Sequence, residues 1–124
     1  MLQLRSILIV ADNSGAKSAS MIGMPGRGRK MIATVGDTIN VVVKHAVPYG
    51  QVKKGEVVRA VIIRTRKEHK RHDGSYIRFD DNACVVLTSK ESKDPKGTRV
   101  FGPVAKEVKD SGFIKIASLA EELY

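Results

Sequence analysis

The chain alternates short apolar, β-branched runs with polar turns, and this pattern predicts a protein built mainly from β-strands. The segments that read as strands are residues 7–11, 17–24, 31–35, 38–47, 57–64, 76–79 and 83–87. Turns rich in glycine and aspartate separate them, beginning with Asp12-Asn13-Ser14-Gly15. Strands of this spacing are typical of a small barrel or sandwich, and a closed barrel leaves no strand edge exposed. We therefore predict a mainly β fold in one domain.

Two of these strands carry unbroken apolar runs, which indicate burial on both faces of the sheet over part of their length. One run is Val41-Val42-Val43, and the other is Ala60-Val61-Ile62-Ile63. An aspartate at Val42 or at Ile62 should therefore unfold the protein, because it would bury an unpaired charge.

The pattern changes after residue 88. Residues 89–97 are polar and contain proline and glycine, which predicts a loop. Pro103 fits the first position of a helix that Gly112 would end, and residues 113–116 read as a last short strand. Ser118 fits the cap of a final helical turn. The single domain, residues 1–124, thus divides into a barrel over about 1–88, a loop over 89–100 and a C-terminal helical part over 101–124.

The composition indicates an aliphatic core and a basic surface. Hydrophobic residues make up 42% of the 124 positions but aromatic residues only 5%, so valine and isoleucine must fill most of the core. The formal net charge is +9, and residues 44–79 hold ten basic against three acidic side chains. This concentration favours a polyanion-binding surface over a merely solvated basic face. A membrane is not expected as a partner, since no amphipathic helix carries the charge and no apolar run is long enough to span a bilayer.

The densest cluster of cations lies between two apolar strands, where a basic segment contains the turn dipeptide Asp73-Gly74. Stiff flanking strands would hold these cations in place for phosphate groups. The side chains that we expect to contact RNA are Lys44, Lys53, Lys54, Arg64, Arg66, Lys67, Lys70, Arg71, Arg78, Arg27, Arg29 and Lys30. We expect them to share one positive surface that fits folded RNA by its shape. Asn13, Ser14 and Asn82 are further candidates that turn geometry explains equally well.

Catalytic and metal-binding chemistry finds little support. His69 and His72 stand three residues apart, but the lysines and arginines around them oppose the binding of a cation. Asp80 and Asp81 are adjacent, so on an extended chain they point to opposite faces. No nucleophile elbow, phosphate-binding loop or dinucleotide motif is present, and Cys84 reads as a reduced core residue. We therefore predict a protein that is not an enzyme and that has no metal site and no cofactor.

Two other functions stay open at this point. A freestanding single-strand RNA-binding barrel would stack bases on rings exposed on one sheet face, and the candidates are Tyr49, Tyr76 and Phe79. The rings are few and are not interleaved with cations, which weakens this alternative. A nuclease would use His69 and His72 as acid and base, although no residue is indicated that would fix their positions.

Several motifs, taken in chain order, resemble one family. The first combines Ala60-Val61-Ile62-Ile63, a basic segment, Asp73-Gly74, Phe79, Asn82 and Val85-Val86. The others are Ala11-Asp12-Asn13-Ser14-Gly15-Ala16, Val35-Gly36-Asp37, Val52-Lys53-Lys54-Gly55 and Gly97-Thr98-Arg99-Val100-Phe101-Gly102-Pro103-Val104. Together they resemble the large-subunit ribosomal protein L-fourteen family over essentially the whole chain, and the length is similar to that of its bacterial or organellar type.

This resemblance implies a small closed five-stranded β-barrel with short C-terminal helices, acting as a structural constituent of the large subunit in the cytoplasmic ribosome. It implies binding to large-subunit rRNA and a contribution to an intersubunit bridge that meets small-subunit rRNA. The implied protein partners are neighbouring ribosomal proteins similar to the families numbered three and nineteen. In bacteria the family also docks a ribosome-silencing factor, and here Thr98, Arg99 and the tail after Gly102 would carry that contact.

Overall fold

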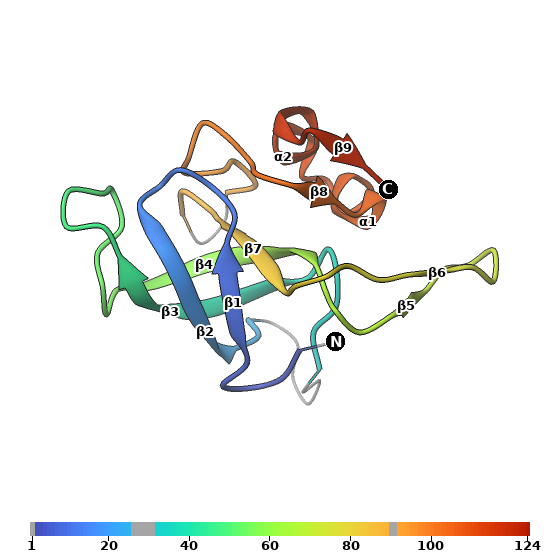
Figure 1. Ribbon diagram of the computed structural model, residues 1–124, viewed down its shortest axis with the longest axis horizontal. Helices are drawn as coiled ribbons and strands as arrows, with labels where there is room; N and C mark the ends of the chain where they lie inside the picture. Colours follow the sequence, from blue (N-terminus) through green and yellow to red (C-terminus); the bar gives the residue numbers. More distant parts are fainter. Residues whose placement is uncertain (1, 26–31, 90–91) are drawn as a thin grey trace.

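The fold is a closed five-stranded β-barrel with one protruding hairpin and a small helical unit (Figure 1). The computed structural model describes residues 2–25, 32–89 and 92–124. The barrel strands are β1 (Ile7–Val10), β2 (Ala16–Gly23), β3 (Thr38–Ala46), β4 (Val57–Arg64) and β7 (Ala83–Val86). Neighbouring strands are antiparallel except where β7 closes the barrel by pairing in parallel with β1. The predicted mainly β, closed-barrel fold is confirmed.

Strand β4 separates two hydrophobic clusters, which explains its unbroken apolar run. Ala60 and Ile62 face the inside of the barrel, together with Leu8, Met21 and Ile39. Val61 and Ile63 alternate with them and pack instead on the helical unit. The prediction that this run is buried on both faces is therefore correct.

Strand β3 departs from the prediction because its valines alternate between interior and exterior. Val41 and Val43 are buried inside the barrel, whereas Val42 points outward and is only half-buried. The run of three valines was read as burial on both faces, but among the described residues no element packs on the outer face of β3 as the helical unit packs on β4. The expected strand over residues 31–35 is also wrong for its described part, where Ala33 makes only an isolated bridge with Leu2.

The hairpin that extends from the barrel, here called the arm (residues 65–82), contains β5 (His69–Lys70) and β6 (Tyr76–Ile77). It projects well beyond the barrel (Figure 1). Its turn is closed by Asp73, whose Oδ1 accepts hydrogen bonds from the Ser75 amide at 3.0 Å and hydroxyl at 2.6 Å. Segment 76–79 was expected to return against β4. It pairs within the arm instead, and only β7 returns to β4.

The C-terminal unit (residues 101–124) comprises β8 (Pro103–Val104), α1 (Lys106–Asp110), α2 (Ile114–Leu119) and β9 (Glu122–Leu123). Pro103 was expected to start a helix, but it lies in β8, which pairs in parallel with β9. A short edge strand tolerates a proline because the missing N–H is not needed. The helix begins three residues later and ends near Gly112, whose φ of +96° agrees with the expected stop.

Two further expectations for the C-terminal unit are wrong. Residues 113–116 do not form a strand, because Ile114 begins α2 and this helix buries Ile116 and Ala117 against the second cluster. Ser118 lies inside α2 and caps nothing, since its hydroxyl donates to the carbonyl of Lys115 at 2.8 Å. In the part of the chain described, no helix is long and apolar enough to cross a membrane.

Candidate nucleic-acid interface

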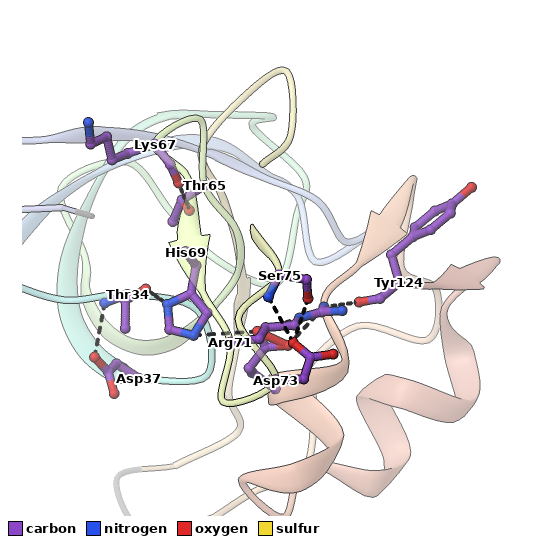
Figure 2. A network of polar contacts seen from close by, with 10 residues as sticks. Thr34, Asp37, Thr65, Lys67, His69, Arg71, Asp73, Ser75 and Tyr124 are labelled. Carbon is purple, nitrogen blue, oxygen red and sulfur yellow. Dashed lines mark hydrogen bonds and ion pairs between the residues drawn. The ribbon is translucent and has the colours of Figure 1, made fainter. Parts of the chain in front are cut away.

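Four of the candidate cations are exposed on the arm and are here called the arm cations. They are Arg66, Lys67, Lys70 and Arg78. Lys67 pairs with Glu68 at 3.0 Å, and the two side chains are 59% and 44% exposed. Its ammonium group points away from the network of polar contacts around His69 and Arg71 (Figure 2). Exposed pairs of this kind contribute little and exchange readily for other partners. The arm cations are therefore available to phosphate groups.

Hydrogen bonds between its two segments close the root of the arm. The side chain of Asn82 accepts a bond from the Arg66 amide at 2.9 Å, and the Thr65 hydroxyl donates to the carbonyl of Lys67 at 2.9 Å. The Phe79 amide closes the root by donating to the carbonyl of Thr65 at 2.9 Å. These contacts give Asn82 the turn role that was left as an alternative to RNA contact.

Arg64 was expected to contact RNA, and its environment does not support that role. Its side chain is only 9% exposed, and its Nε donates to Asp81 Oδ1 at 2.5 Å. Its Nη1 donates to the carbonyls of Phe101 and Pro103 at 3.0 and 3.1 Å. The guanidinium therefore joins the end of β4, the root of the arm and the C-terminal unit, and internal partners take up most of its donors. A basic residue directly after a buried run was the one sequence signal for this structural role.

Arg71 is also held by partners within the protein. Its Nη2 lies 3.0 Å from Glu107 Oε1, and it also donates to the backbone carbonyl of Tyr124. His69 approaches the same carboxylate, with Nε2 3.5 Å from Glu107 Oε2. Figure 2 shows His69 and Arg71 turned toward this network while the ring of Tyr124 points away from it. The role of Glu107 was not anticipated, because nothing local to α1 identifies the arm as its neighbour.

A second basic group consists of Lys44, Lys53 and Lys54, all exposed near the loop between β3 and β4. One of its members is partly used, since Lys53 Nζ donates to the carbonyl of Pro48 at 2.8 Å. In Figure 1 this loop and the arm lie at opposite ends of the molecule. The described candidate cations therefore fall into two groups, one at each end of the molecule. The antiparallel strand β4 leads the chain from one end of the barrel to the other before the arm begins.

The remaining predicted RNA contacts, Arg27, Arg29 and Lys30, lie outside the described residues. The rings proposed for base stacking are divided in the same way as the cations. Tyr49 is 88% exposed in the β3–β4 loop and Tyr76 is 63% exposed on the arm, whereas Phe79 packs partly on the barrel core. These rings do not share one sheet face, which is what a single-strand stacking module would need.

The predicted protein-contact segment is held to the turn after β1. Thr98 and Arg99 are both exposed, and Asn13 Oδ1 accepts bonds from their amides at 2.7 and 3.2 Å. The Asn13 amide group donates in return to the Thr98 hydroxyl at 2.8 Å. Asn13 therefore shapes this segment, a role that its distance along the chain concealed. Ser14 is buried and donates to Asp12, so it serves the turn.

Cys84 and His69, which were considered for catalytic or metal-binding chemistry, lie in surroundings that give them structural roles. Complete burial raises the pKa of the Cys84 thiol, with a smaller contribution from the charge of Asp12, so the thiolate does not form. His69 Nδ1 shares a hydrogen bond with the Thr34 hydroxyl at 3.1 Å, and the other side of the ring faces Glu107. Within the described ranges, no group of three or more His, Cys, Asp or Glu side chains converges as a metal site would require.

Comparison with known proteins agrees with these features. The whole chain, residues 1–124, matches the family described as Ribosomal protein L14p/L23e. The chain is 56% identical over 123 residues to the "Large ribosomal subunit protein uL14" of Aquifex aeolicus (strain VF5), covering 99% of both sequences. It is 55% identical over 123 residues, with the same coverage, to the protein of that name from Aquifex pyrophilus. The family consists of structural ribosomal proteins rather than enzymes. The chain therefore belongs to the ribosomal protein L14p/L23e family.

Proposed function

We propose that this protein is a structural component of the large subunit of the cytoplasmic ribosome and that it binds large-subunit rRNA through its exposed cations. The observation that carries the proposal is the arm, which presents Arg66, Lys67, Lys70 and Arg78 in solvent on a hydrogen-bonded root. Cations held in this way position a protein on RNA through phosphate contacts, which read shape rather than base sequence. Arg64 and Arg71 are not included among the contacts, because internal partners occupy them.

The second basic group supports a further part of the proposal, the intersubunit bridge. Lys44, Lys53 and Lys54 lie at the opposite end of the barrel from the arm. Two separate cationic ends can meet two RNA surfaces at once, as a protein between large-subunit and small-subunit rRNA must do. One end would then anchor the protein in its own subunit while the other contacts the partner subunit.

The proposed protein contacts use a third region. Thr98 and Arg99 are exposed and are held by Asn13, so they form a preshaped patch for a ribosome-silencing factor. A patch whose backbone is already ordered loses less conformational entropy when a partner binds. Neighbouring large-subunit proteins, similar to the families numbered three and nineteen, complete the proposed set of partners.

Charge reversal tests the RNA contact. Replacing Arg66, Lys67 and Lys70 with glutamate should leave the barrel folded, because these side chains are exposed and lie outside the core. The variant should bind deproteinised large-subunit rRNA much more weakly, with a shallower dependence of log affinity on log salt, because fewer counterions are released. It should also fail to enter large subunits during assembly.

The matched control reverses the same number of charges elsewhere. Lys17, Lys109 and Lys115 are exposed and lie outside both the arm and the second basic group. Glutamates there change the net charge equally but should lower affinity less and leave the salt slope near that of the unmodified protein. Equal losses in the two triple variants would show that the arm is only one part of a diffuse basic face.

A further inference from the structure

One acidic side chain, Glu107 of helix α1, holds two basic residues of the arm. Its Oε1 lies 3.0 Å from Arg71 Nη2, and its Oε2 lies 3.4 Å from Arg71 Nε and 3.5 Å from His69 Nε2. The other ring nitrogen of His69, Nδ1, lies 3.1 Å from the Thr34 hydroxyl. Figure 2 shows this ring between Thr34 and the network around Arg71. The arm is thus tied on one side to α1 and on the other to the turn that precedes β3.

This contact is shielded from solvent. The side chains of Glu107, Arg71 and His69 are 20%, 24% and 26% exposed. A shielded, two-point contact between a guanidinium and a carboxylate is stronger and more directional than a surface ion pair. Lys70 lies between His69 and Arg71 in sequence and is exposed, as expected for alternation along an extended strand. The side of β5 that faces α1 is therefore used internally, while its other side is free.

Helix α1 itself is firmly placed against the barrel. Gly36, at φ +85°, lies so close to the helix that an added Cβ would be 3.0 Å from the carbonyl oxygen of Glu107 and 2.8 Å from Ser111 Oγ. Val108 of the same helix is completely buried in the second cluster. Glu107 therefore connects the arm to a rigid support.

The arm needs such support because its own pairing is minimal. β5 and β6 contain two residues each, and an isolated two-stranded hairpin is marginally stable even when it is longer. An arm without external contacts would sample many directions, and RNA would have to order it at a cost in binding free energy.

We propose that Glu107 is a positioning residue for RNA binding, which sets the direction of the arm through Arg71 and His69 so that the arm cations meet phosphates in a prearranged geometry. This inference rests on the proposed function. For removal of the Glu107 charge, it predicts a change in RNA affinity opposite in sign to the change that net charge alone would cause. Removing a negative charge from a protein that binds a polyanion should tighten binding, whereas releasing the arm should weaken it.

The test compares Glu107→Gln with Asp110→Asn. Asp110 lies on the same helix and is exposed, and its replacement changes the charge equally without touching the arm contacts. With deproteinised large-subunit rRNA as the probe, Asp110→Asn should bind as well as the unmodified protein or slightly better. Glu107→Gln should bind about three- to tenfold more weakly, with the salt slope unchanged because the same phosphates are contacted. Affinity of Glu107→Gln equal to or above that of Asp110→Asn would overturn the inference.

An exchange of charges separates positioning from direct contact. Arg71→Glu alone should weaken binding under either role. The double variant Arg71→Glu with Glu107→Arg rebuilds the ion pair in reverse, so it should recover much of the affinity if Arg71 only orients the arm. Binding that stays as weak as in the single variant would show that Arg71 contacts RNA itself, and the inference would fail.

A measurement without RNA distinguishes failure of this inference from failure of the proposed function. Spin labels on cysteines introduced at Tyr76 on the arm and Lys109 on α1 report the distribution of arm directions, while the buried Cys84 stays unlabelled. The distribution should be narrow in Asp110→Asn and broad in Glu107→Gln, and equal widths would overturn the inference. An unmodified protein that shows no salt-dependent RNA binding, but has a narrow distribution that broadens in Glu107→Gln, would instead refute the proposed RNA contact.

Discussion

Arg64 and Asp81 form an ion pair across the root of the arm, with 2.5 Å between Nε and Oδ1. Replacing Arg64 with alanine would leave this carboxylate and the carbonyls of Phe101 and Pro103 without their donors. The carboxylate is 34% exposed, so water can partly replace the guanidinium. We expect Arg64→Ala to lower the free energy of unfolding by about 2 kcal/mol in a denaturant titration.

The control for this prediction is Arg66→Ala, which removes a neighbouring, exposed guanidinium. Its effect on the free energy of unfolding should stay within about 0.5 kcal/mol, while its RNA affinity falls. Arg64→Ala should instead lower the free energy of unfolding and change the RNA affinity less than Arg66→Ala does. A loss of RNA affinity in Arg64→Ala with stability unchanged would mean that the guanidinium faces RNA after all.

A close approach of two glycines secures the loop that bears the second basic group. An added Cβ at Gly15 would lie 2.6 Å from the Gly50 Cα, and Gly15 also has a φ of +108°. Gly55 shares a positive φ, +85°, but has open space around it. Gly55→Ala should therefore destabilise by about 1 kcal/mol, the cost of the backbone conformation alone. Gly15→Ala adds a backbone clash and should destabilise by about 3 kcal/mol or more. Equal losses in denaturant titrations would contradict this account.

The alternation of valines along β3 gives a prediction that replaces the one drawn from the sequence. Val41 is completely buried inside the barrel, whereas the neighbouring Val42 is half-exposed on the outside. Val41→Asp should unfold the protein, because it buries an unpaired charge. Val42→Asp should remain folded, with a loss of about 1 kcal/mol from reduced β-propensity and partial burial. Circular dichroism of the two variants at equal concentration decides the point, and an unfolded Val42→Asp would contradict the alternation.

The barrel strands could be predicted because the residues that indicate a strand lie within the strand itself. The candidate site was harder to predict because its side chains are held by partners far away in the sequence. The alternation of apolar and polar residues, the flanking turn residues and the apolar run of β4 indicate these strands from short stretches of sequence alone. The four-residue spacing of Val104 and Val108 is that of a helix. Val104 nevertheless belongs to a strand, because it pairs with Leu123 far along the chain. Pairing of this kind leaves no local signal. The same holds for Arg64, whose charge suggested RNA while its burial and partners made it structural.

The last prediction concerns a buried carboxylate at the end of β1. Asp12 accepts bonds from the amide and hydroxyl of Ser14 at 3.1 and 2.6 Å, and its other oxygen accepts a bond from the Val86 amide at 3.0 Å. Burial is the largest influence and raises the pKa of Asp12 above its ordinary value of 3.8, although these hydrogen bonds act in the opposite direction. The folded protein therefore holds a proton on Asp12 at a pH where the unfolded chain has lost it. Its contribution to stability must increase as the pH falls through the folded pKa toward 3.8.

Comparison with Asp12→Asn isolates this contribution. Asparagine does not titrate, and its amide group would face the Val86 amide, so Asp12→Asn should be less stable at every pH. The difference in free energy of unfolding, unmodified minus variant, should be larger near pH 4 than at pH 7. The pKa values of Asp73 and Glu68 are lowered chiefly by hydrogen bonds, so their contributions to stability decrease as the pH falls. These contributions are the same in both proteins and cancel in the difference. A difference that shrinks as the pH falls would mean that the hydrogen bonds to Asp12 outweigh its burial.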